Sequence, residues 1–508
     1  MSGPGLDPTF TDLAYRTLGD AALARAQALG ATHADFRFER VRYQHLGVRD
    51  GVLQGAADAE DLGFAVRVIH GGAWGFASGV ILTDDEAVRV AETAVAVAQV
   101  AAAMTTDPVE IAPEPVYDDV TWISSYVVNP LDVPVAEKAA LLVDWTNRLR
   151  KGAAVDHASA SLQQVQENKY YADLAGTRTT QQRVRLQPGF EAMGAGADTF
   201  DSMASIAPPV GRGWEYLTTA AADGGWDWDD EIEQVPELLA EKLKAPSVEA
   251  GSYDLVIHPS NLWLTIHESI GHATELDRAL GYEANYAGTS FATYDKLGTL
   301  QYGAPSMHVT GDRTHPHGLA TVGYDDEGVQ TQSWDIVRDG VLVGYQLDRP
   351  MGHMKPELNG GRSNGCAYAD SPGHIPIQRM ANVSLQPAAD GPSTEELIGR
   401  VGRGIYVVGD KSWSIDMQRF NFQFTGQRFY KIQDGELVGQ LRDVAYQATT
   451  TEFWRSMEAV GGPDTWVLGG AFNCGKAQPG QVAAVSHGCP TSLFRGVRIL
   501  NTNEEGGL

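Results

Sequence analysis

The sequence predicts an α+β protein built from two regions. In the first half of the 508 residues, segments with apolar residues at helical spacing follow short alternating segments that are typical of strands. The second half holds one clear helix near residue 260 and then many short strand-like segments separated by Gly and Asp-Gly turns. We therefore expect an N-terminal α+β domain with mostly antiparallel sheet over residues 1–248. A β-rich C-terminal domain that carries the helix near residue 260 should follow over residues 249–508.

The first elements indicate helices packed on antiparallel strands. Residues 10–29 place apolar side chains at helical spacing, and a glycine follows that can end the helix. Strands are predicted over residues 34–41 and 63–69, and the second leads through a glycine turn into a return strand that includes Ala77.

Two further helices are expected in this region. One covers residues 84–104, where Thr83 and Glu86 have the spacing of a capping box. The other begins near Pro134 and ends near Lys151, because proline is favoured in the first turn of a helix.

The end of the N-terminal region is predicted to return to strands. Residues 157–205 suggest antiparallel strands with turns at Asn168-Lys169 and at residues 173–176. A short helix is expected over residues 236–244. It would be followed by the division between the two regions.

The C-terminal region opens with a predicted strand over residues 252–257. Pro259 then suits the first turn of a helix that bears His267 and Glu268, with His272 at or past its end. Among the later segments, we expect one further clear helix over residues 450–460.

Composition excludes several classes of partner. The formal net charge of −27 would repel the phosphates of nucleic acids and an anionic membrane surface. The densest acidic stretch, residues 227–231, is interpreted as a solvated loop. No apolar run is long enough to cross a bilayer, residues 1–7 do not form a signal region, and three cysteines do not suggest a disulfide framework. We therefore expect a soluble cytoplasmic protein.

The most informative stretch is His267-Glu268-Ser269-Ile270-Gly271-His272. Two imidazoles can hold zinc, and a carboxylate beside the metal can accept a proton from water. The histidines are five residues apart, which separates them by about 140° on a regular α-helix. A regular helix would not aim both at one metal, so we expect it to unwind, bulge or end between them, with Gly271 as the residue that tolerates the break.

A catalytic zinc usually has three protein ligands, so one more is required. Cys474 is favoured because a glycine follows it and Lys476 would lower the pKa of its thiol. A buried free cysteine explains the same residue equally well. Cys489 and His487 are weaker candidates, and Glu275 and Asp277 follow the second histidine closely enough to serve as ligands or to orient an imidazole.

Taken together, these motifs resemble the TldD/PmbA family of metalloproteases, on the side of its active TldD-like members. The resemblance covers nearly the whole chain in one order. It is carried by the stretch from His267 to His272 with Glu275 and Asp277 behind it, Gly323-Tyr324-Asp325-Asp326-Glu327-Gly328, Pro376-Ile377-Gln378-Arg379-Met380-Ala381-Asn382, Cys474-Gly475-Lys476, and, in the first half, residues 63–67 followed by Gly72-Ala73-Trp74-Gly75-Phe76.

The resemblance implies a zinc-dependent peptidase that cleaves unfolded or extended peptides. It implies that His267, His272 and Cys474 bind Zn²⁺ and that Glu268 is the general base. It also implies a dimer, either a homodimer or a heterodimer with a TldE/PmbA-like subunit that lacks the metal motif. Two other functions fit the residues: a non-catalytic regulatory subunit of a two-subunit peptidase, and a zinc amidase that acts on a small modified peptide.

A hydrolytic mechanism needs a donor for the oxyanion besides the metal. Arg379, His374 and Tyr368 are the candidates from the sequence, together with backbone N–H groups of the glycine-rich loops. The acidic residues 325–327 are interpreted as a hairpin turn with solvated carboxylates rather than as a second metal site.

Overall fold

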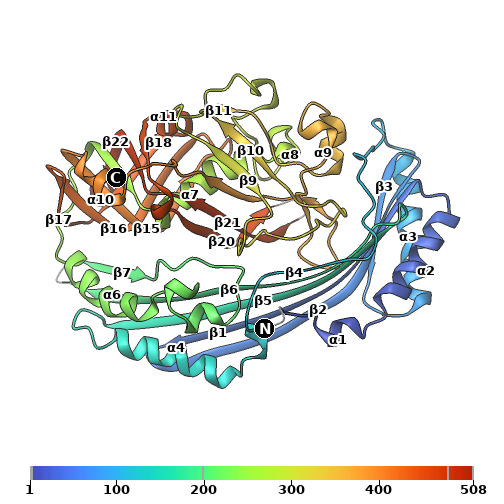
Figure 1. Cartoon of the computed structure of the whole chain (residues 1–508), viewed down its shortest axis with the longest axis horizontal. Helices are drawn as coiled ribbons and strands as arrows, with labels where there is room; N and C mark the ends of the chain where they lie inside the picture. The colour runs from blue at the N-terminus through green and yellow to red at the C-terminus, as the bar shows by residue number, and fades with distance from the viewer. Residues whose placement is uncertain (1–3, 197–198, 477–479, 506–508) are drawn as a thin grey trace.

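The computed structural model describes residues 4–196, 199–476 and 480–505. It confirms the α+β class: long strands form a curved sheet from the N-terminal half, and the β-rich C-terminal half lies on the concave side of that sheet (Figure 1). The predicted division between residues 248 and 249 stays a prediction.

The N-terminal sheet contains seven strands in the order β3-β2-β1-β5-β6-β4, with β7 paired to β6. All pairs are antiparallel except β4 with β6. Four strands have 17 to 19 residues, which makes the sheet long enough to curve around the other half. The strands are β1 (His33–Arg49), β2 (Val52–His70), β3 (Ala73–Gly79), β4 (Val120–Ile123), β5 (His157–Asp173), β6 (Arg178–Ala195) and β7 (Phe200–Ala204).

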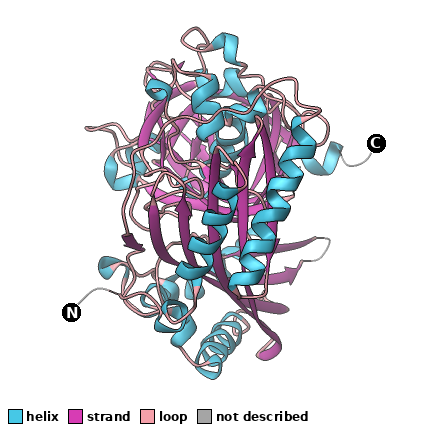
Figure 2. Ribbon diagram, turned by 90° about the vertical axis from the view of Figure 1, so that its right-hand side faces the viewer, coloured by secondary structure: helices cyan, strands magenta, loops and turns pink. Residues whose placement is uncertain are grey.

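The helices of this half form two hydrophobic cores with the sheet. One core lies under α2 and α3, which pack side by side over β1–β3 (Figure 2). The other lies between α4, α6 and strands β5 and β6. The helices are α1 (Pro8–Thr11), α2 (Tyr15–Ala28), α3 (Asp84–Ala102), α4 (Val135–Leu149), α5 (Glu215–Thr218) and α6 (Trp228–Lys242), with short 3-10 turns at Pro130–Asp132 and Ala221–Asp223.

Two predictions for this half are wrong. Asn168 and Lys169 do not form a turn, because both lie inside β5, where their side chains are buried in polar contacts. The acidic stretch is not a solvated loop, because Asp229, Asp230 and Glu231 form the first turn of α6, where the helix dipole favours negative charge. That helix begins eight residues before the predicted start and includes Pro236 in its interior.

The C-terminal half is built from several small sheets. The largest has seven strands in the order β15-β8-β22-β18-β16-β17, with β19 paired to β22. A four-stranded sheet and the pairs β12-β13 and β20-β21 accompany it. The strands are β8 (Gly251–Ile257), β9 (Val309–Asp312), β10 (Ser333–Arg338), β11 (Val341–Leu342), β12 (Ala367–Tyr368), β13 (Ile377–Gln378), β14 (Asn382–Leu385), β15 (Arg403–Ile415), β16 (Asn421–Gln433), β17 (Glu436–Leu441), β18 (Val444–Thr449), β19 (Met457–Val460), β20 (Val467–Lys476), β21 (Gln481–Cys489) and β22 (Ser492–Asn501).

The helices of this half are short. The predicted helix over residues 450–460 ends at Arg455, because the next residues form β19, which pairs with β22 in the large sheet. The helices are α7 (Pro259–Ile266), α8 (Leu276–Ala279), α9 (Arg349–Met354), α10 (Thr394–Gly399), α11 (Thr450–Arg455) and α12 (Thr502–Glu505), with a π turn at His267–Gly271 and 3-10 turns at His272–Thr274, Tyr294–Lys296, Asn359–Gly361 and Pro463–Thr465. None of the helices in the described ranges is long and apolar enough to cross a membrane.

Buried ion pairs join the two halves. The Nζ atom of Lys169 on β5 lies 2.7 Å from a carboxylate oxygen of Asp326, and Arg67 on β2 lies 2.8 Å from Glu327. The hairpin turn predicted at residues 325–327 is present, because Tyr324 and Gln330 form an antiparallel bridge on either side of it. Its carboxylates, however, are buried rather than solvated. Opposite charges from the N-terminal sheet compensate their burial.

Candidate metal centre

The two histidines of the motif project from a helix that changes its geometry between them. Strand β8 leads into α7, with Pro259 in the first turn. The helix continues as a π turn, in which the N–H of His272 donates to the carbonyl of His267, five residues earlier. Because a π turn takes one residue more than an α turn, side chains five apart can lie on one face. The expected irregularity is therefore present.

Gly271 has a different role from the one that the sequence suggested. Its dihedral angles are helical, so it does not supply a conformation that other residues avoid. Instead, a Cβ atom at this position would lie 2.6 Å from the sulfur of Met380. A side chain at this position would therefore have to displace the end of the Met380 side chain, which packs directly against the helix backbone.

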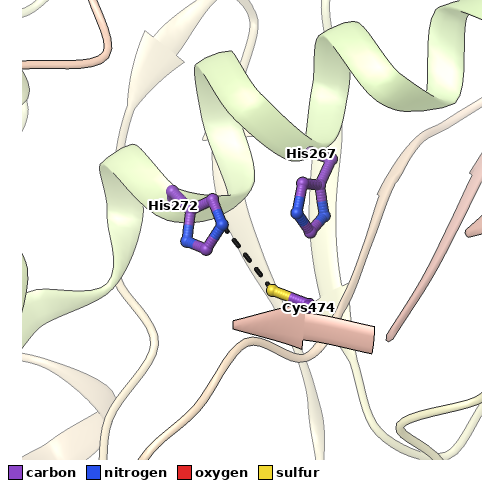
Figure 3. A group of neighbouring side chains, drawn as sticks. All are labelled: His267, His272 and Cys474. Carbon is purple, nitrogen blue, oxygen red and sulfur yellow. Dashed lines mark hydrogen bonds between the residues drawn. The ribbon is translucent and has the colours of Figure 1, made fainter. Parts of the chain in front are cut away.

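Three donor residues meet at one point. The ligand atoms of His267, His272 and Cys474 all lie within 4.8 Å of one another, and all three residues are buried. The Nε2 atom of His272 lies 3.6 Å from Sγ of Cys474. Both imidazoles point from the helix toward the sulfur on β20 (Figure 3). The three residues that the motif and the tail suggested are thus brought together by segments about 200 residues apart.

A histidine outside the motif, His487, fixes the orientation of His267. The Nδ1 atom of His487 lies 2.8 Å from the carbonyl oxygen of Val383, which can only accept, so this nitrogen carries the hydrogen. The Nε2 atom of His487 then accepts from Nδ1 of His267 across 2.7 Å. The Nε2 atom of His267 is left with its lone pair available for a metal.

Glu275 fixes His272 in the same manner. Its Oε2 atom lies 2.9 Å from Nδ1 of His272, which confirms the expectation that Glu275 or Asp277 orients an imidazole. The buried Lys476 holds these carboxylates, at 3.3 Å from Glu275 and 2.8 Å from Asp277. Carboxylates of this kind set the tautomer of a metal-binding histidine.

The electrostatics of the cluster fit a metal cation. Burial lowers the pKa of both motif histidines well below the usual range, so they are neutral, as metal binding requires. Burial raises the pKa of Cys474 to about 11, against the prediction that Lys476 would lower it, because the Lys476 ammonium faces the carboxylates instead. Two imidazole nitrogens and one sulfur form a donor set that suits zinc, whose charge would stabilise the thiolate.

The other two cysteines lie outside this cluster. The Sγ atom of Cys489 donates weakly to the carbonyl of Pro259, at 3.7 Å, and burial raises the pKa of this thiol. Burial raises the pKa of Cys366 to about 12. Both have the properties of structural core cysteines.

Glu268 lies beside the cluster in a buried position and forms an ion pair with Arg419. Burial raises the pKa of Glu268, and the Arg419 guanidinium opposes that shift. Arg419 comes from the turn between β15 and β16, 151 residues away in the chain, and no sequence pattern pointed to it.

The three side chains expected to be oxyanion donors are engaged elsewhere. Arg379 donates to the carbonyls of Cys474 and Gln481, at 2.6 and 3.2 Å, and so holds β20 and β21. His374 pairs with Asp370 at 2.6 Å. The hydroxyl of Tyr368 donates to the carboxylate of Glu167 on the N-terminal sheet, at 2.6 Å.

A cavity of about 780 Å³ lies between the N-terminal sheet and the metal-binding region. Its walls include parts of β1, β5 and β6 on one side and Trp263 and residues 467–473 of β20 on the other. The indole of Trp263 lies 6.3 Å, between ring centroids, from both His267 and His487. The cavity therefore reaches the residue before Cys474 and the aromatic neighbour of the histidines.

Comparison with known proteins gives consistent matches. A model of the PmbA/TldA metallopeptidase C-terminal domain matches residues 250–501, and a model of PmbA/TldA metallopeptidase domain 1 matches residues 34–98. The chain is 27% identical to a metalloprotease of Methanothermobacter thermautotrophicus, over 92% of this chain and 96% of the relative. It is 24% identical to a zinc metalloprotease TldD homolog of Saccharolobus solfataricus, over 94% and 98% of the two chains.

Solved structures share the fold at lower identity. TldE from Thermococcus kodakarensis superposes with a TM-score of 0.67 at 16% identity, over 95% of this chain and 99% of the other. A protein from Thermotoga maritima gives a TM-score of 0.74 at 17% identity, over 96% and 100% of the two chains.

Proposed function

The chain belongs to the PmbA/TldD family of metallopeptidases, and we propose that it is a zinc-dependent peptidase that hydrolyses unfolded or extended peptides. The observation that carries this proposal is the buried cluster of His267, His272 and Cys474 with the carboxylate of Glu268 beside it. A regulatory subunit would have no use for a proton acceptor next to a metal site, whereas hydrolysis by metal-bound water requires one.

The Nε2 atoms of His267 and His272 and the thiolate of Cys474 would hold the zinc ion, which leaves a position for water or substrate. Bound there, zinc would acidify a water molecule and polarise the carbonyl of a peptide bond. His487 and Glu275 act on the ligands: each accepts the Nδ1 hydrogen of one imidazole and keeps the other nitrogen directed at the metal.

Glu268 is the proposed general base. Its carboxylate accepts a proton from the water as the water oxygen attacks the carbonyl carbon, and then transfers that proton to the leaving amine. Glu268 follows directly after a metal ligand, so it lies near the water without occupying a ligand position. Burial that raises its pKa favours this exchange of a proton near neutral pH.

We place the substrate in the cavity along β20. Strand β20 pairs with β21 on one side, and in the described part of the chain no strand pairs with its other side. Residues 467–473 of β20 line the cavity and lead to Cys474. An extended peptide can add to such an edge through main-chain hydrogen bonds, which gives loose sequence preference and requires an unfolded substrate.

The partnership is proposed from the N-terminal sheet. Residues 52–61 of β2 are exposed, and in the described ranges this part of β2 pairs only with β1. A long exposed edge is suited to pairing with another chain, either a second copy or a TldE/PmbA-like subunit. Light scattering of the purified protein and of the variant Gly55→Pro would test this, because proline interrupts edge pairing. A dimer that Gly55→Pro leaves intact would exclude this edge.

The proposed function is tested with one substrate protein in a folded and an unfolded form. The zinc-loaded enzyme is incubated with a small disulfide-bonded protein, either native or reduced and alkylated, so that the peptide bonds are the same and only the fold differs. We expect cleavage of the unfolded form alone, and loss of cleavage after a chelator removes zinc. A stoichiometric zinc content with no cleavage of either form, or of short peptides, would indicate a non-catalytic subunit. Cleavage confined to small modified peptides would indicate an amidase.

A further inference from the structure

We propose that Arg419 is a catalytic residue that stabilises the negative charge on the substrate oxygen during attack by water. This inference rests on the proposed peptidase function and adds the donor that such a reaction needs besides the metal. It is carried by the contact between the Arg419 guanidinium and the Glu268 carboxylate at the edge of the metal cluster.

The guanidinium of Arg419 is directed into the site and keeps hydrogen-bonding capacity. Its side chain is 16% exposed, and among the described residues it forms an ion pair with Glu268 alone. The Nε atom is buried and has no hydrogen-bond partner within the described ranges. A buried donor without a partner is unfavourable in the resting protein. The Nη1 atom meets the Glu268 carboxylate, so a substrate oxygen beside that carboxylate would lie within reach of the guanidinium.

The backbone of Arg419 is fixed in an unfavourable conformation. Its φ is 63°, in the left-handed region that residues with a Cβ avoid. The turn is anchored on both sides, because the N–H of Arg419 donates to the carbonyl of Asp416 at 3.0 Å and its own carbonyl accepts from Thr450 Oγ1 at 2.8 Å. This anchoring holds the base of the side chain in place and aims the guanidinium at Glu268.

The other cationic and hydroxyl groups that the sequence suggested have partners other than the proposed base. Arg379 is committed to two backbone carbonyls that hold β20 and β21. His374 and Tyr368 are bound to carboxylates away from the cluster. Among the arginines and lysines of the described residues, Arg419 is the one whose ion pair is with the proposed base.

The charge balance of the reaction explains why the pair suits catalysis. As the water oxygen bonds to the carbonyl carbon, one water proton moves to Glu268 and the π electron pair of the carbonyl moves onto its oxygen. The negative charge thus leaves the Glu268 carboxylate and appears on the substrate oxygen. Arg419 keeps its positive charge throughout and can follow this transfer with little rearrangement, which is the property of a preorganised donor.

The test compares Arg419→Gln and Arg419→Lys with the wild-type enzyme and with Arg338→Gln, which removes an exposed arginine paired to Asp335. Cleavage of an unfolded peptide gives kcat and KM, and elemental analysis gives zinc content. We expect Arg419→Gln to lower kcat by about 100- to 1,000-fold with KM changed by less than about threefold and zinc retained. The lysine variant keeps the charge, and its loss should be about tenfold. Arg338→Gln should behave as the wild type.

A phosphinic peptide separates a catalytic role from a structural one, because its tetrahedral anion imitates the state after attack. We expect Arg419→Gln to weaken binding of this inhibitor by the same factor as kcat/KM, while the affinity for an uncleaved peptide, measured in the Glu268→Gln background, stays the same. Unchanged kcat, a rise in KM alone, or loss of zinc from both variants would each overturn the role of Arg419. A wild-type enzyme that cleaves no peptide would instead refute the proposed function.

Discussion

The Nδ1 atom of His267 lies 2.7 Å from the Nε2 atom of His487, whose Nδ1 atom donates to the carbonyl of Val383. This chain of two hydrogen bonds leaves one nitrogen of His267 for the metal. His487→Phe would keep a ring of similar size but remove the acceptor. We expect zinc affinity to fall by about 10- to 100-fold, as for other partners of metal-binding histidines. Competition with a chromogenic chelator measures the affinity, and the exposed His353→Phe serves as the control. Equal zinc affinity in His487→Phe and the wild type would show that this contact does not orient the ligand.

The two buried cysteines of the C-terminal segment give a matched pair. Cys474→Ala removes a donor of the cluster, so zinc content should fall from one per chain to near zero and cleavage should be lost. Cys489→Ala removes a core thiol that contacts a backbone carbonyl, and zinc content should stay at one per chain. Elemental analysis of both purified variants decides which of the two cysteines binds zinc. The reverse pattern would assign the thiolate ligand to Cys489.

Glu268→Gln separates metal binding from catalysis. The amide keeps the shape of the side chain but cannot accept a proton, so we expect kcat to fall by about 100- to 10,000-fold while zinc content is unchanged. The exposed Glu436→Gln on β17 is the control and should have full activity. The measurement is the steady-state cleavage of an unfolded peptide. Normal turnover by Glu268→Gln would remove it from the mechanism.

The ion pairs between the two halves should contribute to stability. Lys169→Met would leave Asp326 buried without the cation that lies 2.7 Å from it, and Glu39 would keep only its pair with Arg37. We expect the free energy of unfolding to fall by about 3–5 kcal/mol, as for other broken buried pairs. Arg178→Met, which breaks an exposed pair with Asp20, should change it by less than about 1 kcal/mol. Denaturant unfolding followed by fluorescence measures both, and equal effects would refute the role of burial.

Much of the fold could be predicted from local patterns. Thr83 caps α3, Pro259 begins α7, and the Asp-Gly turns at residues 339–340 and 434–435 join neighbouring strands. These signals act over a few residues and do not depend on contacts with distant parts of the chain. Asn168-Lys169 gave a turn signal that failed, because tertiary contacts of a long strand outweigh the local preference of polar residues.

The candidate site was predictable only where one segment carries several of its groups. The motif gave His267, Glu268 and His272, and the resemblance to a family gave Cys474. Arg419 and the contact of His487 were not predictable, because each depends on how distant strands meet at the helix. The burial of residues 325–327 was missed for the same reason: an acidic turn is normally solvated, and its cations come from the other half of the chain.

The central claim, that His267, His272 and Cys474 bind zinc, is tested most directly by X-ray absorption spectroscopy at the zinc edge of the zinc-loaded protein. We predict one sulfur at about 2.3 Å and the remaining nitrogen or oxygen ligands at about 2.0–2.1 Å. The Cys474→Ala variant, loaded with excess zinc, should lose the sulfur signal. A spectrum without sulfur in the wild-type protein, or one with two sulfurs, would contradict the site described here.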